Sequence, residues 1–311
     1  MSLSSNRVLR TIARVVEIIV ALVFLLAALM KALDPRAFIE QIEAYQIFPE
    51  LAPLAAWSLI IIECILAAGL LVNLYPRIVP LLTSALLLFF IGITVYGMAI
   101  GLGENCGCFG NLYHRGPEMV IIEDTLMLIG LIFATVVLWK QKVERVVARL
   151  SFSLGIGLLA ALVTGFSPAI PADDFVTQLS PGQRFDTWPV DGLYGKNLNS
   201  ETHVVFLFSV DDTQLASKVE RMNAIAQEEA VASAVGLIID GTEHLTALMF
   251  EYAAAFPVAA IEPRFARPLY RTLPRVFILH DGTVTHTWAE LPSPKDVVKA
   301  LGELPQHQDT E

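Results

Sequence analysis

Cysteine is scarce in this chain of 311 residues: only three are present, and none follows Cys108. The part of the chain beyond Cys108 therefore cannot carry out dithiol chemistry by itself. The sequence also lacks a glycine-rich nucleotide loop, a Cys-x-x-Cys-His haem motif, an HExxH motif and a Gly-x-Ser-x-Gly motif. Nothing in it points to nucleotide binding, c-type haem attachment, zinc peptidase chemistry or serine hydrolysis.

Apolar residues make up 55% of the chain and its mean hydropathy is +0.59, which is too apolar for an ordinary soluble protein. The first four apolar runs are about 20 residues or longer, enough to cross a hydrocarbon core about 30 Å thick. A fifth run is shorter and rich in Gly and Ala. The five runs cover residues 11–33, 55–74, 78–102, 119–139 and 150–166.

Basic residues between the runs predict the orientation of the chain, because Lys and Arg accumulate in cytoplasmic loops. Eight of them fall on the side that holds the N terminus, against three on the other side near the membrane. The N terminus is therefore expected in the cytoplasm. With five spans, the loop after residue 102 and the C-terminal part would face outward, into the periplasm of a bacterium, with the spans in its inner membrane.

The net charge of −10 resides entirely in the C-terminal part. Up to Pro168 the chain has 11 acidic and 11 basic residues, whereas from Ala169 onward it has 20 acidic and 10 basic residues. This imbalance argues against nucleic acid or anionic lipid as a ligand. It indicates a solvated domain, with an acidic docking face for a basic partner as the alternative.

Two of the three cysteines, Cys106 and Cys108, lie one residue apart in the loop between the third and fourth runs. A Cys-x-Cys disulfide closes a small, strained ring that is easily reduced, and Gly107 relaxes the backbone between the sulfurs. Three interpretations remain open: a thiol–disulfide relay, a structural bridge, and a soft-metal site. Zinc normally takes four ligands, and His114 is the only evident third one in this loop.

Ionisable side chains inside membrane spans are candidates for function. Glu63 lies near the middle of the second run, Lys31 near the outer end of the first, and Glu123 and Asp124 open the fourth. A Lys31–Glu63 pair with Glu123 or Asp124 nearby is a candidate proton relay, or else a set of groups that satisfy one another between helices. Cys64 points to a different helix face from Glu63 and is interpreted as a small core residue.

Residues 8–140 resemble the DoxX family, in particular its MauE branch of redox-associated membrane proteins. The pieces that carry the resemblance are Met-Lys-Ala-Leu-Asp-Pro at 30–35, the amphipathic stretch 38–49, Glu63, and Cys-Gly-Cys-Phe-Gly at 106–110. The resemblance implies a partner in periplasmic disulfide formation or quinone-linked oxidation. A quinone is the electron acceptor that it suggests, and no other cofactor or metal is expected.

After a linker at 167–173, the periodicity changes to that of an α/β domain. Strands are expected at 203–209, 234–239, 258–261, 275–280 and 283–288, and helices at 212–226, 243–254 and 293–301. Asp281-Gly282 predicts a hairpin turn, Ser293 a helix cap, and Asp211 or Asp212 the cap of the first helix. This order resembles a thioredoxin-like domain, with Leu273-Pro274 at the place of that family's cis-proline.

The thioredoxin-like resemblance breaks down where that family carries Cys-x-x-Cys, because residues 209–214 read Ser-Val-Asp-Asp-Thr-Gln. The domain is therefore expected to bind or assemble with a partner, and Pro274, Asp211 and Asp212 are the candidate partner-binding residues.

The predicted organisation has three parts: a four-span membrane domain at 1–145, a fifth span with its linker at 146–170, and a thioredoxin-like domain without redox cysteines at 171–311. Cys106 and Cys108 are the candidate catalytic residues of a thiol–disulfide relay that supports maturation of a periplasmic redox protein. The alternative is a non-catalytic accessory subunit of a membrane electron-transfer complex, in which the loop disulfide is structural.

Overall fold

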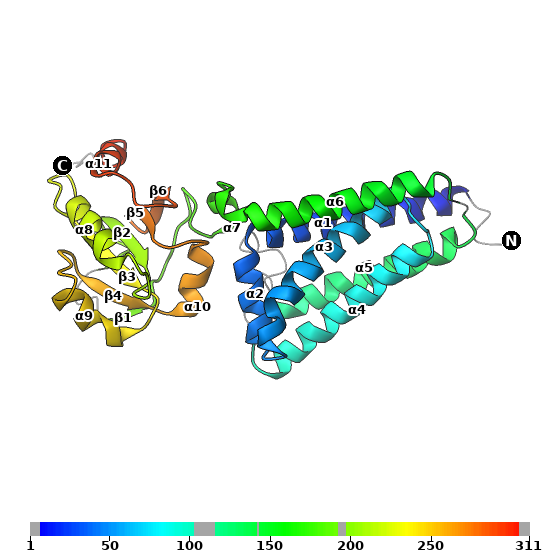
Figure 1. Ribbon diagram of the computed structural model, residues 1–311, viewed down its shortest axis with the longest axis horizontal. Helices are drawn as coiled ribbons and strands as arrows, with labels where there is room; N and C mark the ends of the chain where they lie inside the picture. The colour runs from blue at the N-terminus through cyan, green and yellow to red at the C-terminus, as the bar shows by residue number, and fades with distance from the viewer. Residues whose placement is uncertain (1–6, 103–115, 142, 192–196, 305–311) are drawn as a thin grey trace, which may run out of the picture. The chain divides into compact units, whose positions relative to one another are not determined.

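The computed structural model describes residues 7–102, 116–141, 143–191 and 197–304. Within these ranges the chain divides into two compact units, residues 1–171 and 172–311. The first unit is helical and the second is built on a β-sheet (Figure 1). The loop that holds Cys106, Cys108 and His114 lies outside the described residues.

Five long apolar helices make up most of the first unit, and each is long and apolar enough to cross a membrane. The predicted runs correspond to these helices within a few residues at each end. The fifth helix has 21 residues, so the shortest predicted run also belongs to a helix long enough to be a candidate span. The helices are α1 (Arg7–Leu33), α3 (Ala52–Leu71), α4 (Ile78–Ala99), α5 (Pro117–Leu138) and α6 (Val146–Phe166).

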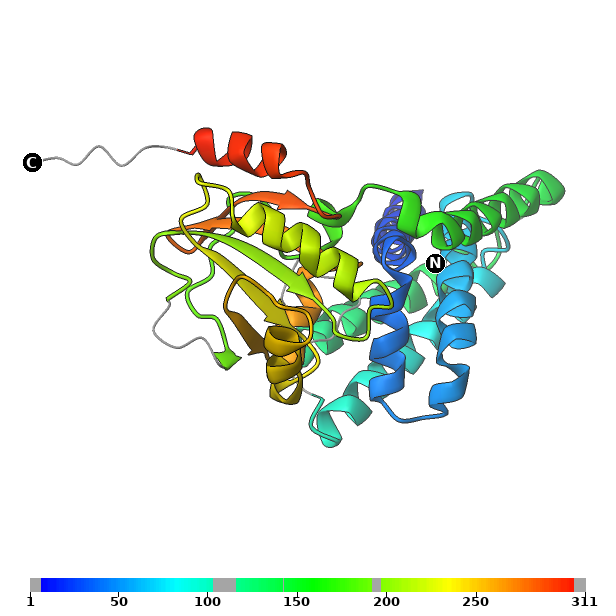
Figure 2. The same cartoon turned by 60° about the vertical axis from the view of Figure 1, so that its left-hand side comes forward.

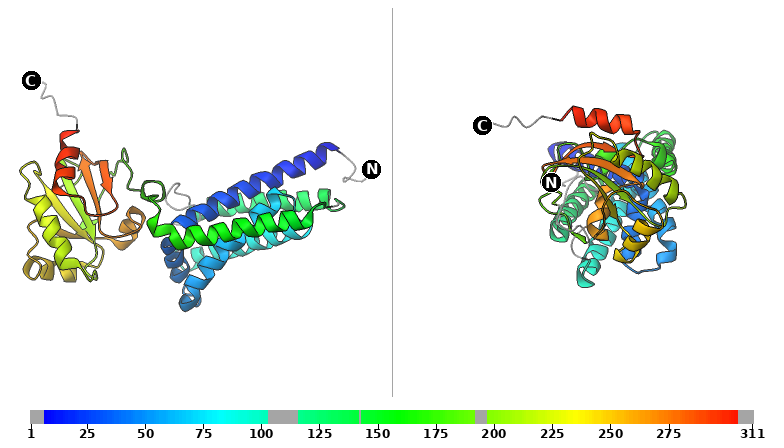
Figure 3. Two further views of the ribbon diagram at one scale, coloured as in Figure 1. Left: turned by 45° about the horizontal axis from the view of Figure 1, so that its top comes forward. Right: turned by 90° about the vertical axis from the view of Figure 1, so that its left-hand side faces the viewer.

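Helices α1 and α3 are the centre of this bundle. Helix α1 packs against α3, α5 and α6, while α3 also packs against α4 and α6. Figure 3 shows these helices running lengthwise beside one another. The buried residues of α6 are all small, namely Ser153, Gly157, Ala160 and Thr164. Small residues let helix backbones approach closely in a membrane, which explains how α6 joins the bundle while its Leu and Phe side chains stay exposed.

A short amphipathic helix, α2 (Pro35–Ala44), follows α1 directly and packs against α1 and α3. Its start is set by Asp34, whose side chain accepts a hydrogen bond from Ala37 N at 3.2 Å, and by Pro35 in the first turn. Phe38 is its buried residue, as the predicted apolar face of this stretch requires.

The second unit contains one six-stranded sheet in the order β1-β4-β3-β2-β5-β6. Strands β2, β3 and β4 are parallel, and β1, β5 and β6 are antiparallel to their neighbours. This mixed sheet and its crossover helices confirm the predicted α/β thioredoxin-like fold class. The strands are β1 (Val190–Asp191), β2 (Thr202–Phe208), β3 (Ala234–Ile238), β4 (Val258–Ile261), β5 (Arg275–His280) and β6 (Thr283–Trp288).

Two apolar layers cover the two faces of the sheet. On one face, Phe206 and Ile278 pack with residues of α8 (Leu215–Ala226), α9 (Leu245–Phe250) and α11 (Pro294–Gly302). Figure 2 shows α8 and α11 along the same side of the sheet. On the other face, Leu207 and Phe277 pack with α10 (Pro263–Ala266) and the short 3-10 helix Arg267–Leu269.

Local signals in the second unit are confirmed where they depend on near neighbours. Ser293 caps α11 in a reciprocal capping box with Asp296. Asp281 and Gly282 both have positive φ, as a two-residue hairpin turn requires. A short helix that the sequence did not indicate follows the predicted linker: α7 (Asp173–Val176) begins at the last residue of that linker.

Two predictions of local structure in this unit are wrong. Helix α8 begins at Leu215 rather than 212, and its N-cap is Gln214, so neither Asp211 nor Asp212 caps it. Asp212 Oδ1 instead accepts a hydrogen bond from Gln214 N at 2.9 Å, which forms a turn before the helix. The second predicted helix is shorter than expected, because α9 ends at Phe250.

Candidate functional site

A buried ion pair joins the first two apolar helices. Lys31 Nζ on α1 lies 2.5 Å from Glu63 Oε1 on α3, and the two residues are 4% and 1% exposed. The sequence predicted this pair, since each residue interrupts an otherwise apolar run. Two charges in an apolar interior are costly unless each compensates the other, so neither side chain can be buried alone.

Two aromatic rings flank the Lys31 ammonium. Its Nζ lies 4.9 Å from the ring centroid of Phe38 on α2 and 5.0 Å from that of Phe90 on α4. A cation over an aromatic face is attracted by the ring quadrupole, and the attraction is stronger when the site excludes water. Lys31 therefore connects four helices: it belongs to α1, pairs with α3, and contacts rings from α2 and α4.

The Glu63 carboxylate is only half satisfied within the described residues. Its Oε1 accepts from Lys31, while its Oε2 is buried and has no hydrogen-bond partner among the groups that the structure describes. A buried oxygen of this kind is unusual, because buried polar groups are nearly always paired. This oxygen can accept a proton without breaking the contact between Lys31 and Oε1.

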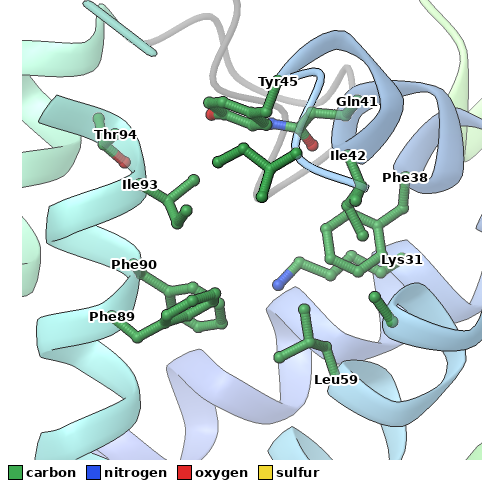
Figure 4. A pocket seen from close by; sticks show the side chains of 12 residues that line it. Lys31, Phe38, Gln41, Ile42, Tyr45, Leu59, Phe89, Phe90, Ile93 and Thr94 are labelled. Atoms are coloured by element: carbon green, nitrogen blue, oxygen red, sulfur yellow. The ribbon is translucent and has the colours of Figure 1, made fainter. Parts of the chain in front are cut away.

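A pocket of about 210 Å³ opens beside Lys31. Figure 4 shows the Lys31 ammonium directed into it, with Phe38 and Phe90 on either side. The remaining described lining residues come from helices α2, α3 and α4 and from the segment after α2. They are Gln41, Ile42, Tyr45, Ile47, Ala55, Leu59, Phe89, Ile93 and Thr94.

The two helices that flank the pocket approach closely at one end. The ring of Tyr45, which follows α2, lies against Gly97 on α4, where an added Cβ would stand 2.8 Å from Tyr45 Cε1. A side chain at position 97 would therefore displace this ring. The sequence did not indicate the pocket, because Phe89, Phe90 and Ile93 are indistinguishable from other lipid-facing residues until α4 is placed against α2.

The other predicted relay residues, Glu123 and Asp124, lie near the start of α5 and are half-buried. Helix α5 packs against α1 and α4, so both carboxylates belong to the same bundle as Lys31 and Glu63. Their part in a proton relay with Lys31 stays a prediction.

Cys64, next to Glu63 in sequence, is buried among Ala28, Ala56 and Ile60. It is a free cysteine in an apolar cluster, in agreement with the interpretation of this residue as part of the core. The candidate catalytic residues Cys106 and Cys108 lie in the segment that the structure leaves undescribed.

A second buried carboxylate, Glu17 on α1, has a structural partner. Arg14 donates to Glu17 and also to the carbonyl oxygens of Leu70 and Leu71, each at 3.0 Å, at the C-terminal end of α3. The guanidinium thus satisfies carbonyl groups that the end of a helix leaves without partners. This arrangement accounts for Glu17 without a functional role.

In the second unit, the Leu273–Pro274 peptide bond is cis, as the sequence predicted. The loop at the place of the missing Cys-x-x-Cys is fixed by Asp240, which accepts hydrogen bonds from Ser209 Oγ at 2.9 Å and Val210 N at 2.7 Å. Asp212 forms an ion pair with Lys218 of α8, and Asp211 is exposed. Partner binding by Pro274, Asp211 and Asp212 stays a prediction.

Sequence reasoning missed a charged cluster beside the cis-proline. Arg275, the residue after Pro274, is 1% exposed and lies 3.3 Å from Asp173 and 3.2 Å from Asp174 of α7. Burial lowers the pKa of the Arg275 guanidinium, and the two carboxylates oppose that shift. Arg271 also pairs with Asp173. The available signal was an arginine at the start of an otherwise apolar strand, directly after Pro274.

Within the described ranges, no three His, Cys, Asp or Glu side chains come together as a metal site.

The N-terminal unit matches a known family. The family model of the methylamine utilisation protein MauE matches residues 9–140, a range that includes Lys31, Glu63, Cys106 and Cys108. No curated protein matches the sequence.

Solved structures similar to the C-terminal part include the following three. One is a thiol:disulfide interchange protein from Bacteroides sp., with 9% identity and a TM-score of 0.35, covering 43% of this chain and 97% of that chain. Another is a thiol:disulfide interchange protein of the thioredoxin family from Chlorobium tepidum TLS, with 16% identity, a TM-score of 0.29, and coverage of 34% and 80%. A third is a thioredoxin-related protein from Neisseria meningitidis serogroup B, with 13% identity, a TM-score of 0.30, and coverage of 36% and 96%.

Proposed function

We propose that this chain is a thiol–disulfide relay of the bacterial inner membrane, in which Cys106 and Cys108 exchange electrons with a periplasmic redox protein. The observation that carries the proposal is the buried Lys31–Glu63 pair, which lies within the same MauE-matched region as the two cysteines. Charged groups at this depth are expensive in a membrane protein and are characteristic of proton and electron pathways.

Thiol oxidation releases protons as well as electrons, and the bundle offers groups that can take them. When Cys106 and Cys108 form a disulfide, two electrons and two protons leave the two thiols. Glu63 holds Lys31 through one oxygen while its second oxygen has no partner among the described groups. We assign proton transfer to this pair, with Glu123 and Asp124 as further members of the relay.

The thioredoxin-like domain is assigned the role of a docking module. It has the sheet and the cis-proline of its fold class but no cysteine, so its contribution is binding rather than dithiol chemistry. Pro274, Asp211 and Asp212 are the proposed contact residues for the partner. The basic residues at the cytoplasmic ends of the spans support an N terminus in the cytoplasm and this domain in the periplasm.

The test is the reduction potential of the Cys106/Cys108 pair, measured by thiol trapping and mass spectrometry across a redox buffer series in intact membranes. A reversible potential above about −250 mV supports a relay, since structural disulfides have potentials below about −300 mV. A bridge that resists reduction below about −300 mV contradicts it. Cys64→Ser is the matched control, because Cys64 is buried in the core and lies outside the proposed exchange.

The missing thioredoxin cysteines favour a second candidate, a non-catalytic accessory subunit of a membrane electron-transfer complex. In that case the loop disulfide pins the segment before α5 and the C-terminal domain forms an interface. Replacing Cys106 and Cys108 by serine separates the two functions. Loss of partner oxidation with normal assembly indicates the relay, whereas loss of assembly indicates the subunit.

A further inference from the structure

We infer that the pocket beside Lys31 binds the ring of a membrane-soluble quinone, with the Lys31 ammonium facing a ring carbonyl oxygen. The redox part of this inference rests on the proposed function, because the electrons that the quinone would receive come from the thiol–disulfide relay. The binding of the quinone does not depend on the relay. The geometry, charge and surroundings of the pocket each narrow the class of ligand.

The size of the pocket limits the ligand to a small group. Its volume of about 210 Å³ lies below the range of roughly 300–1,000 Å³ that is usual for complete ligand sites. It therefore suits one substituted ring, with the rest of the molecule outside. Phe89, which lines the pocket, is 50% exposed and Ile47 is 42% exposed, so the pocket opens at the apolar surface of the bundle.

The charge of the pocket favours a neutral ligand. Lys31 is the charged member of the described lining, and Glu63 compensates it at 2.5 Å. A phosphate or carboxylate ligand would compete with Glu63 for a single ammonium inside an apolar site, and its desolvation would be costly. A carbonyl oxygen accepts a hydrogen bond from an ammonium without bringing a new charge into the site.

The shape of the lining favours a flat ligand over a lipid chain. Phe38, Phe89, Phe90 and Tyr45 line the pocket with aromatic side chains, which pack well against another ring in offset or edge-to-face arrangements. An acyl chain would fill the space but carries no group that accepts a hydrogen bond at the depth of the rings. A flat, neutral, lipid-soluble ring that carries carbonyl groups is a quinone.

The redox step that would follow quinone binding conserves both electrons and protons. The thiols of Cys106 and Cys108 lose two electrons and two protons as the S–S bond forms, and the quinone takes up two electrons and two protons to become a quinol. Thr94 of the pocket lies on α4, the helix that leads directly into the segment with the two cysteines.

The experiment is equilibrium binding of ubiquinone-1, a short-chain benzoquinone, to the full-length protein in detergent. Ile93→Trp should fill the pocket and weaken binding at least tenfold, whereas Leu88→Trp on the exposed side of α4 should leave it unchanged. The double variant Lys31→Met with Glu63→Gln, which removes both charges together, should also weaken binding at least tenfold. The thermal stability of both tryptophan variants is measured first, and their quinone binding is compared only if each is as stable as the parent protein.

Three results would overturn the inference: no saturable binding to the parent protein, equal binding to the Ile93→Trp variant, or a tightly held phospholipid that the quinone does not displace. Binding is also measured with Cys106 and Cys108 replaced by serine. Quinone binding to the parent without any thiol oxidation, by quinone or by another acceptor, would refute the relay and leave the pocket assignment standing. Thiol oxidation by another acceptor, with no quinone bound, would do the reverse.

Discussion

Lys31 Nζ lies 2.5 Å from Glu63 Oε1 in the interior of the helical bundle, and the two side chains are buried only because they are buried together. Removing either partner leaves an uncompensated charge among apolar side chains. Such a change is strongly destabilising, by about 3–5 kcal/mol in buried pairs, whereas replacing both partners is far less costly.

We therefore predict that Lys31→Met and Glu63→Leu each lower the stability of the bundle by about 3 kcal/mol or more, and that the double variant recovers most of that loss. The measurement is a double-mutant cycle on detergent-solubilised full-length protein, followed by denaturant unfolding. Glu50→Gln, at an exposed carboxylate before α3, is the control and should be nearly neutral. Additive losses in the cycle would show that the two groups do not compensate each other.

Helix α6 gives a prediction about close packing between spans. A Cβ at Gly157 would stand 2.5 Å from Ile65 Cγ1 of α3, closer than two carbon atoms can approach. Because Ile65 is β-branched and stiff in a helix, we expect Gly157→Ala to cost about 1–3 kcal/mol through overpacking. Thermal unfolding in detergent measures the change.

The matched control lies two residues away on the same helix. A Cβ at Gly155 would meet nothing within 4 Å, so Gly155→Ala should be neutral or slightly stabilising, as alanine is the better helix former. If the two alanine variants behave alike, α6 does not dock on α3 through Gly157.

The long helices could be predicted from sequence because a membrane span is a local signal: an apolar run of sufficient length is helical whatever its neighbours are. The pairing of Lys31 with Glu63 followed from the cost of burying either charge alone. The pocket could not be predicted, since Phe38 and Phe90 are far apart in sequence and come to the same Lys31 ammonium only when α2 and α4 pack in the bundle.

The second unit shows the same division between local and distant signals. The hairpin turn at Asp281 and the cap at Ser293 depend on adjacent residues, and both were predicted. The start of α8 was misplaced, because Asp212 can satisfy a nearby backbone N–H either as a helix cap or in a turn. The Arg275–Asp173 contact joins residues about a hundred positions apart, and no short-range pattern encodes it.

That contact leads to a prediction about how the start of the second unit is held to its sheet. We expect Arg275→Met to destabilise the unit by about 3 kcal/mol, since it leaves the largely buried Asp173 without its nearest partner on β5. Asp174→Asn should cost less than about 1 kcal/mol, because the Asp174 side chain is 57% exposed. Urea unfolding of the full-length protein, followed by tryptophan fluorescence, compares the two.

Arg184→Met is the control for this series. Arg184 pairs with Asp186 at 3.8 Å, and the two side chains are 69% and 92% exposed, so its loss should be close to neutral. A loss for Arg184→Met as large as that for Arg275→Met would mean that fluorescence responds to any arginine change, and that the cluster at α7 has no special role.

The ion pair at the place of the missing cysteines gives a pH-dependent prediction. Burial acts to raise the pKa of Asp212, but the hydrogen bonds from Lys218 and Gln214 N and the charge of Lys218 outweigh it, so the pKa is lowered overall.

A carboxyl group with a lowered folded-state pKa contributes stability above its unfolded pKa of about 3.9 and loses that contribution as the pH falls through the folded value. We therefore expect Asp212→Asn to be less stable than the parent by under about 1 kcal/mol at pH 6, with the difference shrinking as the pH falls below about 4. Thermal unfolding of both proteins at several pH values between 3 and 6 measures this, and Asp211→Asn separates the loss of the Lys218 contact from the loss of one negative charge. A difference that stays constant over the whole range would show that the Asp212–Lys218 pair contributes no acid-dependent stability.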